Sequence, residues 1–216
     1  IRVDTYSKMV AIKRLYLDHI IVQKAVKSGA ALSQSRVTNI EQNDDFVSIS
    51  TAESVSSIQA KICILATGAH ITLGKKIGII DDARPNAVAV RCYVKSPIAI
   101  DRLVFSYDKE IIPGYGWIFP LPNGEFNIGC GVLRNQVITE NLNLHRVFDR
   151  FTSTFPLAKE IMEKATEKTK LVGAPLRYGF VGVSVPRVDR IISTGESIGT
   201  TFPFTGEGIG KAMESA

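Results

Sequence analysis

The residues best suited by type and spacing to do chemistry lie near the end of the 216-residue chain, in a glycine-rich run at positions 203–210. Gly206, Gly208 and Gly210 stand just before residues 211–216, which are typical of a helix start. Glycine has no Cβ atom, so backbone at these positions can come close to a ligand. The unpaired N–H groups of a first helical turn also favour negative charge. The run therefore predicts a site where main-chain amides hold an electron-rich group.

A second stretch, just upstream, supports this prediction. Residues 190–193 are typical of a buried strand, and they run into a turn that contains Gly195 and the acidic Glu196. A strand, an acidic turn, a glycine-rich loop and a helix start form a layout that suits a cofactor. Two ordinary turns between strands and helices are the alternative interpretation of either stretch alone. Taken together, the two stretches favour a cofactor.

The composition is that of an ordinary globular protein, with 45% hydrophobic and 22% charged residues. The formal net charge is +5, but acidic residues lie between the basic ones, as in the run 159–170. Such alternation indicates a solvated helix face, so we expect no nucleic-acid partner. No apolar run approaches the ~18 residues of a membrane span.

The cysteines and histidines predict no metal or redox site. Cys63, Cys92 and Cys130 lie far apart in apolar runs, and no pair has the spacing of a ligand or redox motif. We therefore expect buried free thiols, as in a reducing compartment. The 3 histidines share no ligand spacing either.

Local patterns in the first part of the chain predict a helix and four strands. The helix is expected within residues 10–28, before an antiparallel meander of three strands at 31–40, 46–51 and 56–61. Four apolar residues at 62–65 then predict a strand buried on both faces, as in a parallel sheet. Small residues follow that strand, and ligands of open α/β sheets bind at strand ends.

A different pattern after residue 86 predicts a second, inserted domain with an antiparallel sheet. The apolar runs on either side of Asn123-Gly124 predict a β-hairpin, because this dipeptide favours tight turns. One or two helices are expected within 142–165, with Pro156 as an interruption or a restart. The strand-like runs of this domain are 87–94, 102–106, 116–122, 125–132 and 171–182.

Three runs match consecutive fingerprints of one known fold. They are Ala66-Thr67-Gly68-Ala69, Gly195-Glu196 and residues 203–209. In this order they resemble the flavoprotein monooxygenase-type fold, which aromatic hydroxylases, flavin halogenases and geranylgeranyl reductases share. Residues 115–120 and 129–131 further resemble the Tyr-x-Trp-x-Phe-Pro … Gly-x-Gly signature of geranylgeranyl reductases. The Trp-x-Trp-x-Ile-Pro signature of the halogenases is absent.

The resemblance implies an α/β fold with an α+β insertion. Residues 1–86 and 186–216 would form a Rossmann-like FAD-binding domain that lacks its N-terminal βαβ unit, and 87–185 an inserted antiparallel-sheet substrate domain. The family's Gly-x-Gly-x-x-Gly turn is missing. We therefore expect a piece of a longer protein, truncated at both ends, that by itself binds FAD weakly or not at all and is inactive.

The resemblance also implies which residues contact FAD. Glu196 stands where the family usually has an Asp that holds the ribityl chain, so its hydrogen bond must be re-aimed or lost. The amides of residues 206–209 would face the pyrimidine edge of the flavin, where reduction leaves negative charge. The full set of implied cofactor contacts is Arg14, Ala66, Thr67, Gly68, Gly195, Glu196, Pro203, Gly206, Glu207, Gly208 and Ile209.

The inserted domain would supply the substrate wall. Tyr115, Trp117 and Phe119 alternate along one strand and so share a face, which suits a long apolar substrate; core packing is the alternative. Arg177 would meet a polar head group, with an ordinary surface position as the alternative.

The activity that the resemblance implies is reduction of carbon–carbon double bonds in a prenyl or other apolar substrate by an FAD-dependent oxidoreductase. The electron donor would be NAD(P)H or ferredoxin, and no catalytic acid or base is identified. An aromatic monooxygenase of the same fold and a catalytically degenerate binding module remain alternatives. We expect a cytoplasmic protein with peripheral contact to a membrane.

Overall fold

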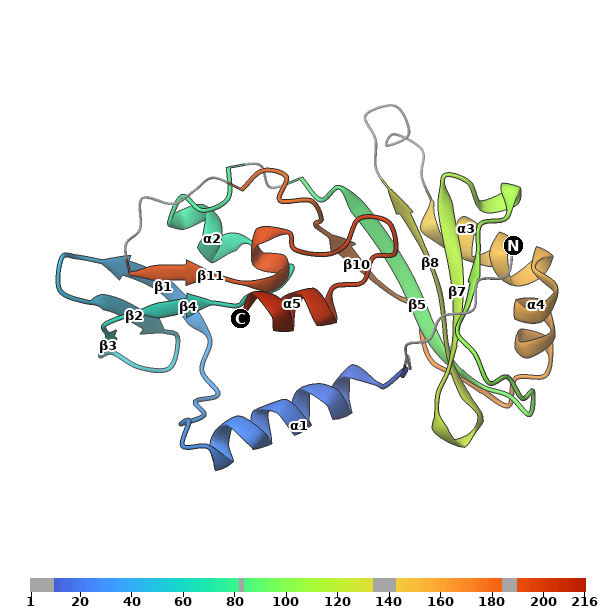
Figure 1. Ribbon diagram of the computed structural model, residues 1–216, viewed down its shortest axis with the longest axis horizontal. Helices are drawn as coiled ribbons and strands as arrows, with labels where there is room; N and C mark the ends of the chain where they lie inside the picture. Colours follow the sequence, from blue (N-terminus) through green and yellow to red (C-terminus); the bar gives the residue numbers. More distant parts are fainter. Residues whose placement is uncertain (1–9, 82–83, 134–142, 184–189) are drawn as a thin grey trace. The chain divides into compact units, whose positions relative to one another are not determined.

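The computed structural model describes residues 10–81, 84–133, 143–183 and 190–216. They form two compact units (Figure 1): unit 1 takes the described residues of 1–32, 89–133 and 138–173, and unit 2 those of 33–88 and 174–216. Each unit has its own apolar core. The chain thus divides near residues 88 and 173, and its first helix is grouped with unit 1. The cofactor and substrate roles assigned to the two parts stay predictions.

Unit 2 contains the expected antiparallel meander. Its strands β1 (Val37–Gln42), β2 (Val47–Thr51) and β3 (Ile58–Ala60) pair in sequence order. The first turn is closed by the side chain of Asn43, whose Oδ1 atom accepts hydrogen bonds from the amides of Asp45 and Phe46, each at 2.9 Å. This part of the sequence-based prediction is confirmed.

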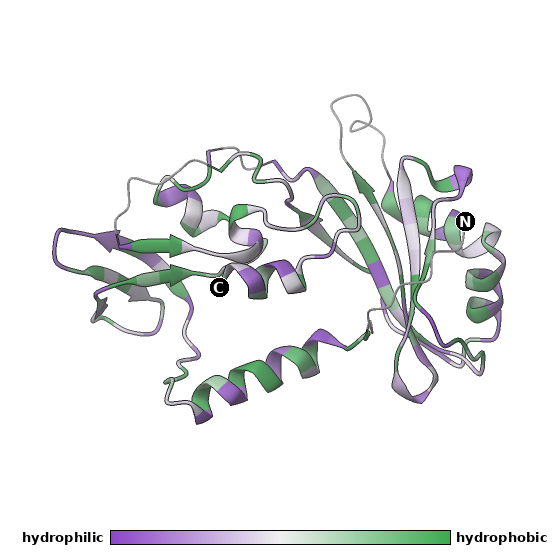
Figure 2. Cartoon of the chain, in the orientation of Figure 1, coloured by the Kyte–Doolittle hydropathy of each residue, from purple (hydrophilic) through white to green (hydrophobic). Residues whose placement is uncertain are grey.

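A parallel strand pair lies beside the meander. Strand β4 (Cys63–Leu65) pairs in parallel with β11 (Ile191–Ser193), as the apolar run predicted, and both strands are strongly hydrophobic (Figure 2). The expectation of burial on both faces is wrong for the described structure. Ile64 and Ile192 are 63% and 55% exposed, because successive side chains alternate and only one face packs against the unit 2 core.

Most of unit 1 is an antiparallel sheet in the order β10-β5-β8-β7-β6, with the short β9 beside β5. The predicted hairpin joins β7 to β8, and its Asn123 and Gly124 have φ angles of 62° and 70°. Asparagine and glycine adopt this left-handed conformation more easily than other residues do, which is why the Asn-Gly pair favours the turn. The strands are β5 (Ala87–Lys95), β6 (Val104–Ser106), β7 (Gly114–Pro120), β8 (Glu125–Leu133), β9 (Glu167–Lys168) and β10 (Val172–Leu176).

Two helices, α3 (Leu144–Thr154) and α4 (Pro156–Glu163), cover one face of this sheet. Pro156 occupies the first turn of α4, where its missing N–H costs nothing, so the predicted restart is confirmed. Phe151 and Ile161 are 1% and 0% exposed and pack against the sheet residues of the core.

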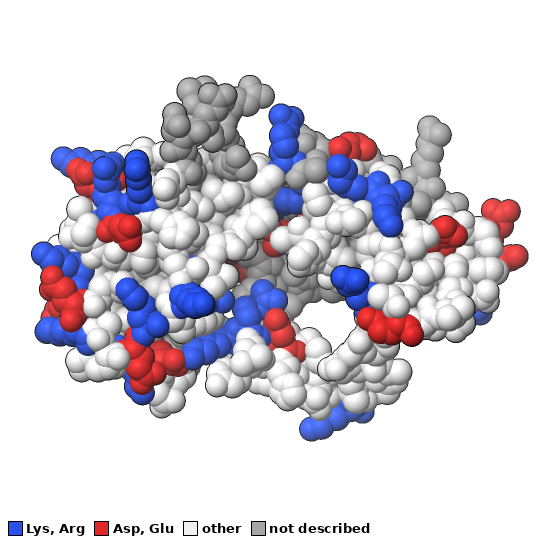
Figure 3. All heavy atoms as spheres, turned by 180° about the vertical axis from the view of Figure 1, so that it is seen from behind, with Lys and Arg blue, Asp and Glu red and all other residues white. Residues whose placement is uncertain are grey.

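Helix α1 (Arg14–Lys27) also lies where a helix was predicted, and Gly29 follows it with φ of 102°. None of its residues is buried. No helix in the described part of the chain combines the length and apolar character needed to cross a bilayer. On the face drawn in Figure 3, Lys and Arg side chains lie beside Asp and Glu over much of the surface. The cysteines are free and buried, as expected.

Candidate functional site

The predicted substrate residues Tyr115, Trp117 and Phe119 lie on one face of β7 and are half-buried. The alternate residues of the strand point into the core, where Ile118 is fully buried. The three aromatic rings lie outside the core that α3 and α4 form with the opposite face of the sheet. Their role in substrate binding stays a prediction.

Two further aromatic residues extend this face. Phe105 on β6 lies across from Trp117, and its ring centroid is 5.2 Å from that of Phe119. Tyr107 stacks on Tyr115 at 5.7 Å. Sequence reasoning missed both. Their alternating positions, within and just after the predicted strand 102–106, indicated that the two rings share a face but not which strand lies beside them. We call the five residues Phe105, Tyr107, Tyr115, Trp117 and Phe119 the aromatic surface.

Trp117 is held at the centre of the aromatic surface by its neighbours on β8. Its indole Nε1 donates a 3.1 Å hydrogen bond to Oδ1 of Asn127. A Cβ atom on Gly129 would lie 2.2 Å from Cζ2 of the indole, so only glycine leaves room for the ring to lie across this strand. A Cβ on Gly131 would make only ordinary contacts, the nearest at 3.6 Å. The first glycine of the Gly-x-Gly signature therefore has a steric role here.

The aromatic surface is uncharged at neutral pH. Burial raises the pKa of Tyr115 to about 12, and the neighbouring Tyr107 adds to this shift. Tyr115 therefore keeps its proton and presents a neutral hydroxyl among apolar rings.

In unit 2 the structure brings the predicted cofactor segments together. The short helix η3 (Gly195–Ile198) follows β11, and its Ser197 Oγ donates to the carbonyl of Leu65 at 3.1 Å, at the end of β4. Helix α5 (Ile209–Ser215) packs on η3, where Ser215 Oγ accepts a 3.0 Å bond from the amide of Gly195. Residues 66–68, 195–196 and the loop before α5 thus gather at the carboxyl end of the parallel pair.

The glycine-rich loop uses part of its hydrogen-bonding capacity internally. The amide of Gly206 donates to the carbonyl of Phe202 at 2.9 Å, and that of Glu207 donates to Thr205 Oγ1 at 3.3 Å. Among the described residues, the amides of Gly208 and Ile209 find no partner. The carboxylate of Glu207 itself sits at the start of α5 and accepts a 2.6 Å bond from the amide of Gly210. Two of the four predicted amides are thus available to a ligand.

Thr67, another residue predicted to contact the cofactor, has a buried hydroxyl. Thr67 follows β4, and its Oγ1 is buried without a hydrogen-bond partner in the described structure. An unsatisfied buried hydroxyl costs ~1–3 kcal/mol, so it suits a position that a ligand completes. The neighbouring Gly68 has φ of 58° and opens the turn beside it, whereas Ala66 and Pro203 are exposed.

Glu196 and Arg177 contact each other. Oε1 of Glu196 accepts a 3.1 Å hydrogen bond from the amide of Arg177, so this carboxylate is directed at least partly into the protein. Arg177 is only 4% exposed, and its Nη2 donates to the carbonyl of Val181 at 3.0 Å. The alternative of an ordinary surface arginine is therefore wrong. Arg177 belongs to unit 2, and its contact with a head group stays a prediction.

Arg14 lies on the exposed face of α1. Its guanidinium makes two hydrogen bonds with the carboxylate of Asp18, at 2.7 and 3.1 Å. Its approach to a flavin diphosphate stays a prediction.

Known proteins resemble the chain over most of its length. It is 25% identical to conditioned medium factor receptor 1 of Dictyostelium discoideum over 96% of this chain and 42% of the relative. It is 28% identical to a menaquinone reductase of Mycobacterium tuberculosis (95% of this chain, 52% of the relative). It is also 28% identical to digeranylgeranylglycerophospholipid reductase of Methanosarcina acetivorans (94% and 50%). The predicted resemblance to geranylgeranyl-type reductases is confirmed. No family model matches the chain.

Solved structures of geranylgeranyl reductase-like and related flavin enzymes share the fold. A geranylgeranyl bacteriochlorophyll reductase-like protein of Thermoplasma acidophilum matches with a TM-score of 0.75 at 22% identity, over 93% of this chain and 51% of that chain. A flavin-dependent brominase matches with a TM-score of 0.72 at 18% identity, over 94% and 53%. The predicted mixed α/β fold with antiparallel sheets is confirmed. The chain spans about half the length of the curated relatives that it matches.

Proposed function

We propose that this chain is part of an FAD-dependent oxidoreductase that reduces carbon–carbon double bonds of a prenyl or other apolar substrate. Unit 2 would belong to a Rossmann-like FAD-binding domain, and unit 1 would bind the substrate. The names of relatives at 28% identity, a menaquinone reductase and a digeranylgeranylglycerophospholipid reductase, support reduction as the activity. NAD(P)H or ferredoxin would supply the electrons, in a cytoplasmic protein with peripheral contact to a membrane.

The aromatic surface is the observation that carries this proposal. It is a continuous row of rings on the sheet face that α3 and α4 leave uncovered, and Tyr107 in it is 53% exposed. Covering such rings with an isoprenoid chain contributes ~0.8 kcal/mol for each buried CH₂ group. Because the rings form an extended row, a long chain can contact more of them at once than a compact ligand can.

The residues of unit 2 fit an FAD group. The hydroxyl of Thr67 and the amides of Gly208 and Ile209, which have no partner among the described residues, are donors at the carboxyl end of the parallel pair, where α/β folds bind ligands. FAD, when bound and reduced by the electron donor, would supply the hydride that reduces a double bond, and a proton would complete the reaction. The two amides would stabilise negative charge on the group that they face. Tyr115, whose pKa burial raises to about 12, would be protonated beside the substrate.

A non-catalytic binding protein is the second candidate. One specific observation favours it: the Dictyostelium relative, 25% identical over 218 residues, is named a receptor. The inward hydrogen bond of Glu196 fits this candidate too, since it removes one oxygen from contact with a ribityl chain. An aromatic monooxygenase has support from the fold alone.

Anaerobic reoxidation of the flavin tests the proposal. The FAD-loaded protein is reduced without oxygen and mixed with an unsaturated isoprenoid. A reductase recovers the oxidised flavin spectrum without oxygen and yields a product with one fewer double bond. A monooxygenase stays reduced until oxygen enters and then consumes it with an aromatic substrate. A binding protein does neither, and that result would reject the proposal.

A further inference from the structure

The face that carries the aromatic surface continues across β8 onto β5. Gly131 faces Ala89 near one end of these strands, and Ser96 bonds to Gly124 at the other, so β8 and β5 run antiparallel. This register places Arg91 across from Gly129, which itself pairs with Trp117. With strands ~4.8 Å apart, the Cα atoms of Trp117 and Arg91 are roughly 10 Å from each other.

Arg91 is a cation without an anionic partner. It is half-buried, and its guanidinium carbon lies 4.4 Å from the ring centroid of Tyr93 on the same strand. Within the described residues it makes no ion pair and no hydrogen bond through its side chain. Stacking on Tyr93 fixes the plane of the guanidinium, so that its N–H donors stay free while the side chain is ordered.

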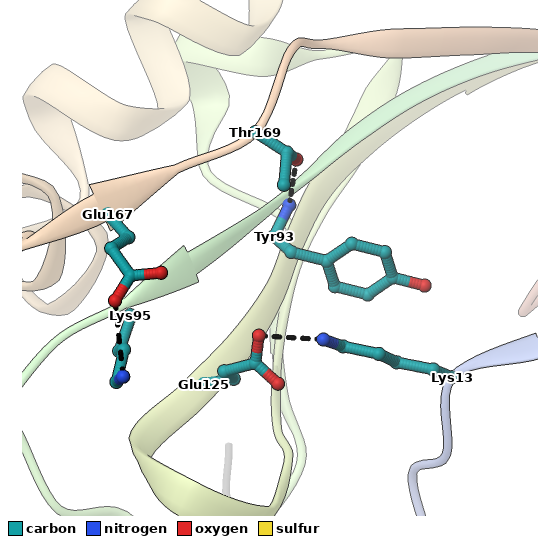
Figure 4. A network of polar contacts seen from close by, with 6 residues as sticks. All are labelled: Lys13, Tyr93, Lys95, Glu125, Glu167 and Thr169. Carbon is teal, nitrogen blue, oxygen red and sulfur yellow. Dashed lines mark hydrogen bonds and ion pairs between the residues drawn. The ribbon is translucent and has the colours of Figure 1, made fainter. Parts of the chain in front are cut away.

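Two cations near Arg91, Lys13 and Lys95, each have a carboxylate partner. Lys13 also lies over Tyr93, at 5.0 Å, but its Nζ is 2.6 Å from Oε1 of Glu125 (Figure 4). Lys95 pairs with Glu167 at 3.1 Å. In the part of the chain that the structure describes, this face thus has an apolar side on β6 and β7, and the guanidinium of Arg91 on β5 has no ion-pair partner.

We propose that Arg91 binds the phosphate of an isoprenoid whose chain lies over the aromatic surface. A guanidinium binds a phosphate through two parallel hydrogen bonds, which an ordered arginine forms at low entropic cost. Gly129 has no side chain, so the indole of Trp117 lies across β8 and extends towards Arg91, and one molecule can reach both residues. This proposal rests on the proposed function and adds Arg91 as the residue that would select a phosphate head group at that site.

Trp117 makes a direct binding test possible, because it is the only tryptophan of the chain. Its fluorescence is titrated with farnesyl phosphate, with farnesol and with inorganic phosphate in the 216-residue chain, in Arg91→Ala and in Lys95→Ala. Lys95 is the matched control, because its loss changes charge equally on the same strand but removes a cation that already has a partner. We expect farnesyl phosphate to bind at least about tenfold more tightly than farnesol, and inorganic phosphate to leave the emission unchanged.

The two variants distinguish the role of Arg91 from the proposed function on which that role rests. Arg91→Ala should weaken farnesyl phosphate about tenfold and leave farnesol unchanged, whereas Lys95→Ala should leave both within about twofold. Equal affinity of the two prenyl ligands, or equal effects of the two variants, would overturn the role of Arg91 and leave the proposed function intact. No quenching by either prenyl ligand would overturn both proposals.

Discussion

Replacing Gly129 by alanine tests the steric design of the aromatic surface. The added Cβ would lie 2.2 Å from Cζ2 of Trp117 and 2.5 Å from the carbonyl oxygen of Val90, so both the ring and the neighbouring strand must move. Such overpacking costs ~1–3 kcal/mol. Displacing the indole also breaks its hydrogen bond to Asn127, worth ~0.5–1.5 kcal/mol. We expect Gly129→Ala to lower the free energy of unfolding by about 2–4 kcal/mol.

The assay is urea unfolding followed by the fluorescence of Trp117, which also reports whether its ring has become exposed to water. Gly131→Ala is the control on the same strand and face, because its Cβ would meet Ala89 at an ordinary 3.6 Å. Its effect should stay within ~1 kcal/mol and tend towards stabilisation, since alanine restricts the unfolded chain more than glycine does. Equal midpoints for the two variants, with unchanged emission, would refute the steric argument.

Three further predictions follow from the structure. Because burial raises the pKa of Tyr115 to about 12, its contribution to stability should be complete below pH ~10 and be lost as the pH rises towards 12. An ultraviolet titration of the protein, compared with that of Tyr115→Phe, should show one tyrosine that loses its proton at a higher pH than an ordinary tyrosine does. Thr67→Val should lower FAD affinity about threefold to tenfold in a calorimetric titration. It should not lower the unfolding free energy, because the Thr67 hydroxyl has no hydrogen-bond partner in the described structure. A loss of stability would show that this hydroxyl does have a partner within the protein. Phe151→Ala should cost ~3–5 kcal/mol in urea unfolding, and Phe105→Ala, at a site that is 38% exposed, clearly less; equal costs would contradict the assigned core.

The sequence predicted those elements that local chemistry determines. The Asn123-Gly124 hairpin, the restart at Pro156 and the meander closed by Asn43 each depend on a few neighbouring residues. The shared face of Tyr115 and Trp117 follows from the two-residue repeat of a strand. These features need no knowledge of distant contacts, so the pattern was sufficient.

Features that depend on which strands are neighbours, or on hydrogen-bond partners, could not be predicted from the sequence. Phe105 joins the aromatic surface only because of the register between β6 and β7, and Arg91 faces Gly129 only because β5 lies beside β8. The sequence pattern likewise could not show that Gly206 and Glu196 use hydrogen-bonding groups internally. The exposure of Ile64 was missed because a short apolar run does not say how many faces are covered.

A crystal structure of the FAD-loaded protein with an isoprenoid phosphate tests the central claim most directly. The proposed function predicts that the prenyl chain lies along Tyr115, Trp117 and Phe119, with its double bond facing the flavin ring. A prenyl chain bound elsewhere, with the aromatic surface covered by protein side chains, would contradict it.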